Sequence, residues 1–205
     1  FTPPYSLFSK KDYKSLYESS SRADREELYR WIEYYKIKFK SRVYTPLNNS
    51  EKYTLVLMGR ADFGLLGSYN KYKQTPFETF HVGGDGMTGS YTYATETIGL
   101  RGYDNGALTP YSDGRAYTRF SMELHFPFLL QPSSTIYGLA FVEGGNAWTS
   151  LENFNPFSLK RSAGVGVRIF LPMIGLMGID WAYGFDKVQG EKGGGHFHFI
   201  LGQEF

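Results

Sequence analysis

The sequence FHFILGQEF, from Phe197 to Phe205, decides the fold class of this chain. Its apolar residues Phe197, Phe199, Leu201 and Phe205 recur with a period of two. A strand that ends on an aromatic carboxy-terminus leaves an apolar edge and tip exposed in a soluble protein. The same strand suits a transmembrane β-barrel, where one face meets lipid and aromatic residues lie at the interface. The stretch therefore indicates the closing strand of a membrane barrel.

Composition agrees with a barrel and excludes other classes. The 205 residues carry a formal net charge of +2, which disfavours a nucleic-acid partner. The chain has no cysteine, which excludes disulfides, thiolate metal sites and cysteine nucleophiles. It also has no run of about 18 or more apolar residues, so no transmembrane helix is expected. Aromatic residues make up 18% of the chain and glycines number 24, as suits aromatic girdles and tight turns.

Period-two alternation predicts seven strands. They cover residues 28–45, 53–66, 115–128, 136–145, 161–171, 176–185 and 196–205. Residues 21–35 also fit an amphipathic helix, and we favour a strand from Leu28 onward. In the first strand, basic residues alternate with others at Lys36, Lys38, Lys40 and Arg42. We interpret this one-sided charge as a wetted lumen face rather than an anion or nucleic-acid site.

The connections between these strands alternate between short and long. Short turns are predicted near residues 46–49, 127–134 and 172–175, and long connections near 3–27, 67–114, 148–160 and 186–195. Outer-membrane barrels combine short periplasmic turns with longer external loops, and bacterial ones have an even number of strands. Seven strands and a stub at residues 1–2 are too few for a closed barrel. We therefore predict an all-β fold in which residues 1–205 form the C-terminal half of a transmembrane antiparallel β-barrel.

The longest connection, residues 67–114, is predicted to fold back into the barrel lumen. Its segment IGLRGY, residues 98–103, places Arg101 among apolar side chains that need cover. A buried guanidinium needs a carboxylate, because an unpaired buried charge is costly. Glu123 and Glu143 lie on the predicted inward faces of the next two strands. We therefore expect Arg101 to fork between these two glutamates.

Four motifs in this order resemble the BamA family of outer-membrane insertion and translocation barrels. IGLRGY is similar to the signature loop motif of that family, and SMEL, with Glu123, to the strand that follows it. FVEGG resembles the family's aromatic-x-acid-x-Gly strand motif, with Glu where Asp is common. FHFILGQEF resembles its closing strand and terminal recognition signal. The loop and strand motifs contain the candidate site residues Arg101, Gly102, Tyr103, Glu143, Gly144 and Gly145.

The resemblance implies a function without covalent chemistry. It implies a 16-stranded barrel that serves as the core subunit of the machinery folding and inserting β-barrel proteins into the bacterial outer membrane. Its expected partners are outer-membrane lipid, unfolded outer-membrane protein clients and accessory assembly lipoproteins. The periplasmic POTRA domains and early strands of the family are absent from these 205 residues.

The resemblance also implies a lateral gate at the last strand. In this family a weak seam between the first and last strands is proposed to open sideways and template an incoming strand. Gly202 fits such a seam, since glycine weakens a strand and permits a kink, but a simple bulge or packing glycine fits equally. Phe205 is either an interface aromatic or part of the signal by which the barrel is itself assembled.

Enzymatic and metal-dependent functions are disfavoured. His196 and His198 share one strand face, but no third ligand is near in the pattern, so no metal or other cofactor is expected. Ser121 and His125 lie about 13 Å apart at strand rise, too far for a nucleophile and its base. Two other functions stay open. One is a related translocase that exports a specific partner, and the other is a passive porin, which would not need a pinned Arg101.

Overall fold

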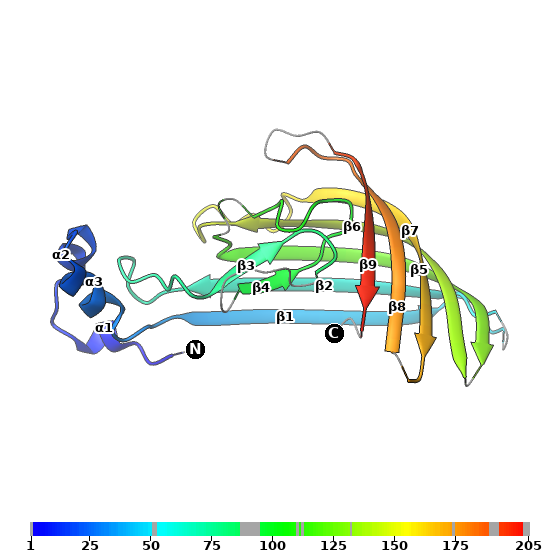
Figure 1. Ribbon diagram of the computed structural model, residues 1–205, viewed down its shortest axis with the longest axis horizontal. Coiled ribbons are helices and arrows are strands. Elements are labelled where there is room, and N and C mark those ends of the chain that lie inside the picture. The colour runs from blue at the N-terminus through cyan, green and yellow to red at the C-terminus, as the bar shows by residue number, and fades with distance from the viewer. Residues whose placement is uncertain are drawn as a thin grey trace.

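The computed structural model describes residues 2–50, 53–86, 95–109, 111, 113–131, 133–173, 175–188 and 193–202. Seven antiparallel strands form one curved sheet in the order β1-β2-β5-β6-β7-β8-β9 (Figure 1). Their bounds are β1 Tyr35–Pro46, β2 Val56–Gly67, β5 Ala116–Gln131, β6 Ser134–Trp148, β7 Lys160–Leu171, β8 Gly175–Gly184 and β9 Gly195–Leu201. The predicted number of strands and their antiparallel, all-β arrangement are confirmed. Within the described residues the sheet is open, with β1 and β9 at its edges.

The two faces of the sheet differ in chemistry. Large apolar side chains such as Val142 and Phe199 point outward and are more than half exposed. Charged side chains such as Asp62, Arg119 and Asp180 point inward and are buried. This arrangement suits a wall between lipid and a polar barrel interior.

The connection between β2 and β5 packs against the inner face of the sheet (Figure 1). It contains two short parallel strands, β3 Thr79–Val82 and β4 Thr95–Ile98. Phe80 and Leu100 of this connection form an apolar core with Leu66 and Tyr117 of the sheet. The rings of Phe80 and Tyr117 meet edge to face, with their centroids 4.7 Å apart. The loop is therefore a small folded unit with its own core, built on the inner wall.

The strand predicted over residues 28–45 is wrong at its beginning. Three short helices, α1 Tyr5–Phe8, α2 Tyr13–Glu18 and α3 Arg22–Tyr29, precede β1, which starts only at Tyr35. Helix α3 carries an i,i+4 ion pair of 2.8 Å between Arg22 and Glu26 and buries Leu28. Helical spacing therefore outweighs the two-residue alternation up to Tyr29. Among the described helices, none is long and apolar enough to cross a membrane.

The short turn predicted near residues 127–134 lies within that range but starts later than expected. β5 continues through Pro127 to Gln131, and its pairing with β6 shifts register between Pro127 and Leu129. A bulge of this kind tolerates a residue that has no backbone N–H to donate to the ladder. The strand therefore passes the proline instead of ending there.

Candidate functional site

The site centres on Arg101, which the loop carries to the inner wall. Arg101 is 7% exposed, and its Nη2 donates to Glu123 Oε1 and, at 2.5 Å, to Glu143 Oε1. Nη1 donates to Asp180 Oδ2 at 3.0 Å, and the backbone N–H of Arg101 donates to Glu143 Oε2 at 2.9 Å. Both expected glutamates are therefore in contact with the arginine. A third carboxylate, Asp180, joins them.

The surroundings of Arg101 keep its guanidinium charged and oriented. The guanidinium carbon lies 3.5 Å from the centre of the Phe141 ring, a cation–π contact on the face that carries no hydrogen bonds. Burial lowers the pKa of Arg101, but the negative charges of Glu143 and Glu123 outweigh this effect and raise it well above its ordinary value. The arginine is therefore a permanent cation in a planar fork, as recognition of several carboxylates requires.

Asp180 and Arg168 extend the cluster, and the sequence reasoning missed both as site residues. Asp180 is fully buried and accepts two hydrogen bonds from Arg168, at 2.5 and 2.7 Å. In the sheet, Asp180 lies opposite Gly166, and Arg168 lies opposite Gly178. A Cβ at Gly178 would lie 2.7 Å from Arg168 Cδ, and one at Gly166 would overlap Asp180. The sequence contains a glycine opposite each of these two inward charges, and this pattern could have indicated that the two side chains need space on the inner face.

Gly102 brings the loop into contact with the last strand. Its φ of 88° lies in the left-handed region, and a Cβ would lie 2.8 Å from Ser162 Cβ and 3.0 Å from Gly184 N. The N–H of Gly102 donates to His198 Nε2 at 2.9 Å, so that nitrogen accepts and carries no proton. Glycine is therefore required here both for the backbone conformation and for the close approach to the wall.

The histidines of β9, which were considered only as a metal pair, both face the loop. Besides the contact of His198 with Gly102, His196 Nδ1 lies 3.2 Å from Asp104 Oδ1. The two imidazole rings stack with their centroids 6.2 Å apart. The geometry makes this pair a link between the last strand and the loop.

The other motif residues take separate roles. The Tyr103 hydroxyl donates to Arg161 O of β7 at 2.6 Å, and burial raises the pKa of Tyr103 to about 12. A Cβ at Gly145 would lie 3.1 Å from Leu100 Cδ1, so this glycine makes room for the loop. Gly144 lies next to it on the outer face, where a Cβ would make only ordinary contact.

The last strand presents apolar side chains to the outside and ends in a kink. Phe197, Phe199 and Leu201 are all more than half exposed on the outer face. Gly202 has a φ of 93° and donates its N–H to Leu176 O at 2.8 Å. This left-handed backbone is a bend that glycine permits, and it fits a seam kink or a simple bulge equally. Phe205 lies outside the described residues.

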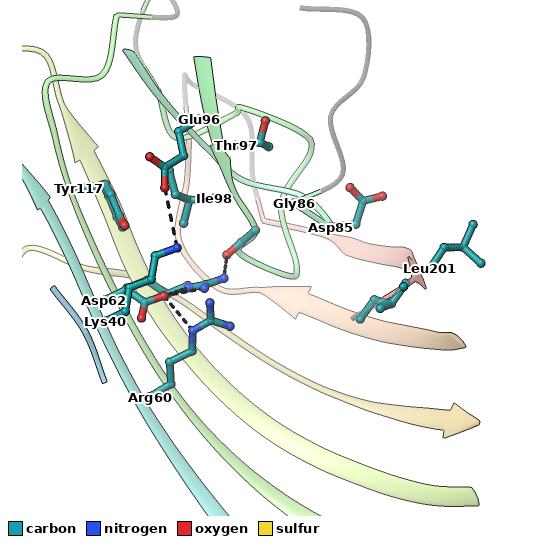
Figure 2. Close-up of a pocket in the computed structure, with 14 residues that line it drawn as sticks. Lys40, Arg60, Asp62, Asp85, Gly86, Glu96, Thr97, Ile98, Tyr117 and Leu201 are labelled. Carbon is teal, nitrogen blue, oxygen red and sulfur yellow. Dashed lines mark hydrogen bonds and ion pairs between the residues drawn. The ribbon is translucent and has the colours of Figure 1, made fainter. Parts of the chain in front are cut away.

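A polar cavity of about 330 Å³ lies between the loop, the inner wall of β2 and the end of β9 (Figure 2). On its wall Asp62 Oδ2 accepts hydrogen bonds from Arg60 Nε at 2.8 Å and Arg119 Nη2 at 2.6 Å. Arg119 Nη1 also donates to Gly99 O at 2.6 Å, two residues before Arg101. A second arginine therefore fixes the backbone of the motif loop.

The basic residues of β1 are engaged by the same loop. Glu96 of β4 lies 3.0 Å from Lys36 Nζ, 3.1 Å from Lys38 Nζ and 3.8 Å from Lys40 Nζ. Burial raises the pKa of Glu96, but hydrogen bonds from Lys36 and Lys38 outweigh this and lower the pKa overall. Lys36 also pairs with Glu78 at 2.8 Å. The one-sided charge therefore has partners within the chain, which favours the lumen-face interpretation.

The fold and the site define an outer-membrane β-barrel protein with a pinned lumenal loop. Residues 20–205, most of the chain, match the Omp85 superfamily domain, and the chain belongs to this superfamily. Its structure is similar to that of BamA from Haemophilus ducreyi lacking POTRA domains 1–3, with a TM-score of 0.61 and 21% sequence identity. The likeness covers 82% of this chain and 34% of that one, so this chain spans about a third of its length. The family resemblance and the bacterial outer-membrane location predicted from the motifs are confirmed.

Proposed function

We propose that this protein folds and inserts other β-barrel proteins into the outer membrane, as the core subunit of the assembly machinery. The observation that carries the proposal is the attachment of one loop arginine to inward carboxylates of β5, β6 and β8. Such a pin keeps the lumenal loop in one position while a neighbouring strand moves. A passive porin has no need of it, because its loop has only to narrow a water-filled channel.

In this proposal the described strands belong to a 16-stranded barrel whose lateral gate is β9. The barrel opens at β9, and a client strand adds to the freed edge by main-chain hydrogen bonds. Two features support a weak edge: β9 has 7 residues whereas β5 has 16, and the left-handed Gly202 follows its last residue, Leu201. The proposed partners are outer-membrane lipid, unfolded barrel clients and accessory lipoproteins.

We also propose that the site performs no covalent chemistry. Ser121 Oγ donates to Glu143 Oε1 at 3.0 Å, and His125 Nε2 lies 2.8 Å from Glu123 Oε2. The serine and the histidine are therefore each engaged with a carboxylate of the cluster, which does not suit a nucleophile and base pair.

A reversible lock on the last strand tests this function. These 205 residues contain no cysteine, so in a full-length protein freed of any other cysteine, Leu201→Cys can be paired with one cysteine on the barrel's first strand. In cells depleted of the unmodified protein, oxidation is expected to stop the folding of client barrels, and reduction to restore it. Full client folding with the lock closed contradicts the lateral gate.

A matched lock and two further readouts separate the alternatives. Val167 and Ile179 are cross-strand neighbours on the outer face of β7 and β8, so a Val167→Cys/Ile179→Cys disulfide should leave client folding unchanged. Depletion that leaves all barrels folded, together with large and steady single-channel conductance, favours a porin instead. Depletion that stops the export of one partner alone favours a translocase.

A further inference from the structure

The outer face of the sheet contains a groove that the proposed function does not use. Its volume is about 660 Å³, within the range of about 300–1,000 Å³ typical of ligand pockets. One row of cross-strand neighbours in its floor runs Ser41, Ala61, Phe120, Gly144 and Arg161. The next row runs Val43, Gly59, Met122 and Val142. The small residues of both rows leave a depression between the large ones.

The connection between β6 and β7 forms one wall of this groove. It folds down over the outer face, where Thr118 Oγ1 donates to Pro156 O at 3.3 Å and Asn146 Nδ2 donates to Ser158 O at 2.8 Å. Phe157 lies between these two anchored carbonyls and is 80% exposed. The wall is therefore held in place by its backbone while an aromatic side chain projects from it.

Positive charge gathers where the groove reaches the start of β7. Arg161 lines the groove, and its side chain is 69% exposed even though it pairs with Asp186 at 3.0 Å. Lys160 directly precedes Arg161 in the chain, and its Nζ donates to the backbone carbonyl of Lys187 at 2.8 Å. Two cations, Arg161 and Lys160, thus act on one carboxylate, Asp186, at the boundary between strand and loop. In a membrane barrel this boundary lies at the level of the lipid headgroups.

We propose that this groove binds one anionic, phosphate-bearing lipid, with an acyl chain along the apolar floor and the phosphate against Lys160 and Arg161. The chain belongs to an outer-membrane protein, so lipid hydrocarbon is what the outer face meets. An apolar groove alone accepts any acyl chain. The basic end selects for negative charge, because lysine and arginine at a membrane surface attract anionic lipid and arginine binds phosphate in a fork. The proposal does not depend on the assembly function.

Quenching by brominated lipids tests the proposal on the full-length protein. A bimane dye on Phe157→Cys reports on the groove, and one on Val167→Cys reports on the outer face away from it. The protein is placed in phosphatidylcholine vesicles that contain either brominated phosphatidylglycerol or brominated phosphatidylcholine at the same fraction. Phosphatidylglycerol should quench the Phe157→Cys dye more strongly than phosphatidylcholine, and the two lipids should quench the Val167→Cys dye equally.

Two sets of variants make the outcome decisive. Lys160→Gln/Arg161→Gln should abolish the excess quenching by phosphatidylglycerol, whereas Lys10→Gln on the helical segment should preserve it. Gly59→Leu should reduce quenching by both lipids, because a Cβ at Gly59 meets nothing within 4 Å and the larger side chain fills the groove without a clash. Equal quenching by both lipids at Phe157→Cys, or an excess that survives the double substitution, overturns the proposal.

Discussion

Substitution of Arg101 by alanine should release the loop from the wall while the strands stay paired. The change removes the cation shared by three carboxylates, whereas Arg168 still contacts Asp180, His125 still contacts Glu123 and Ser121 still donates to Glu143. Glu123 and Glu143 are then left buried without their arginine. Breaking a buried pair in this way costs about 3–5 kcal/mol, because the remaining charge is uncompensated.

Hydrogen exchange at two amides reports this loss directly. The Arg101 N–H is bonded to Glu143 and the Gly102 N–H to His198, so both exchange only when the loop opens locally. A loss of about 3–5 kcal/mol corresponds to about 10²- to 10⁴-fold faster exchange at these amides. Amides in the β5–β6 ladder should change far less, and folding of client barrels should fall more than the barrel's resistance to unfolding.

A matched arginine supplies the control. Arg161→Ala removes a two-point pair with Asp186 of the same chemistry, but at an exposed position. Exposed pairs add little, so exchange at the Arg101 and Gly102 amides should stay as in the unsubstituted protein. Unchanged exchange in Arg101→Ala refutes the pin, and so does a loss spread evenly over loop and strands.

Three further changes test other parts of the site. Gly102→Ala should detach the loop from β9, because alanine disfavours the left-handed backbone and its Cβ meets Gly184; retention of the exchange protection of that amide contradicts this. Asp180→Asn should lower the free energy of unfolding by about 3–5 kcal/mol, because it leaves the buried Arg168 without its carboxylate. In a double-mutant cycle, Asp180→Asn/Arg168→Met should recover much of this loss, because it removes both charges. Although burial raises it, the pKa of Glu96 is lower in the folded protein than its ordinary value of 4.5, because the carboxylate pairs with lysines of β1. The contribution of Glu96 to the stability of the folded loop is therefore complete above pH 4.5 and is lost as pH falls through the folded-state pKa. Glu96→Gln should remove this acid-dependent loosening of the loop, as measured by limited proteolysis across that range.

The sheet and the arginine pin were predictable because both follow from alternation. Once Glu123 and Glu143 were assigned to inward faces, a buried Arg101 had few possible partners, and both contacts are present. Asp180 and Arg168 were on inward faces too. Their meeting depends on the strand register, which sets each charge opposite a glycine, and single-sequence alternation does not fix register across a turn.

The parts that could not be predicted depend on packing between distant segments. The parallel pairing of β3 and β4 joins two short segments that residues 83–94 separate in the sequence, and neither segment has a clear period. The end of α3 at Tyr29 could not be predicted, because residues 21–35 fit both the spacing of an amphipathic helix and the two-residue alternation of a strand. The contact of Gly102 with His198 links residues 96 positions apart and involves a backbone donor, which no side-chain pattern reveals.

The bonds that hold the loop differ in strength, and the weakest lead to the last strand. The buried ion pairs of Arg101, which together cost about 3–5 kcal/mol to break, hold the loop to β5, β6 and β8. Among the described residues, the link to β9 includes one hydrogen bond between Gly102 and His198, worth about 0.5–1.5 kcal/mol net, and an exposed contact between His196 and Asp104. We therefore expect that, under strain, the contact between the loop and β9 breaks before the contacts of the loop with β5, β6 and β8. If the proposed seam between β9 and the barrel's first strand opens, the pinned loop would lie close behind the freed edge of β9, where it could limit how far an entering strand moves into the lumen.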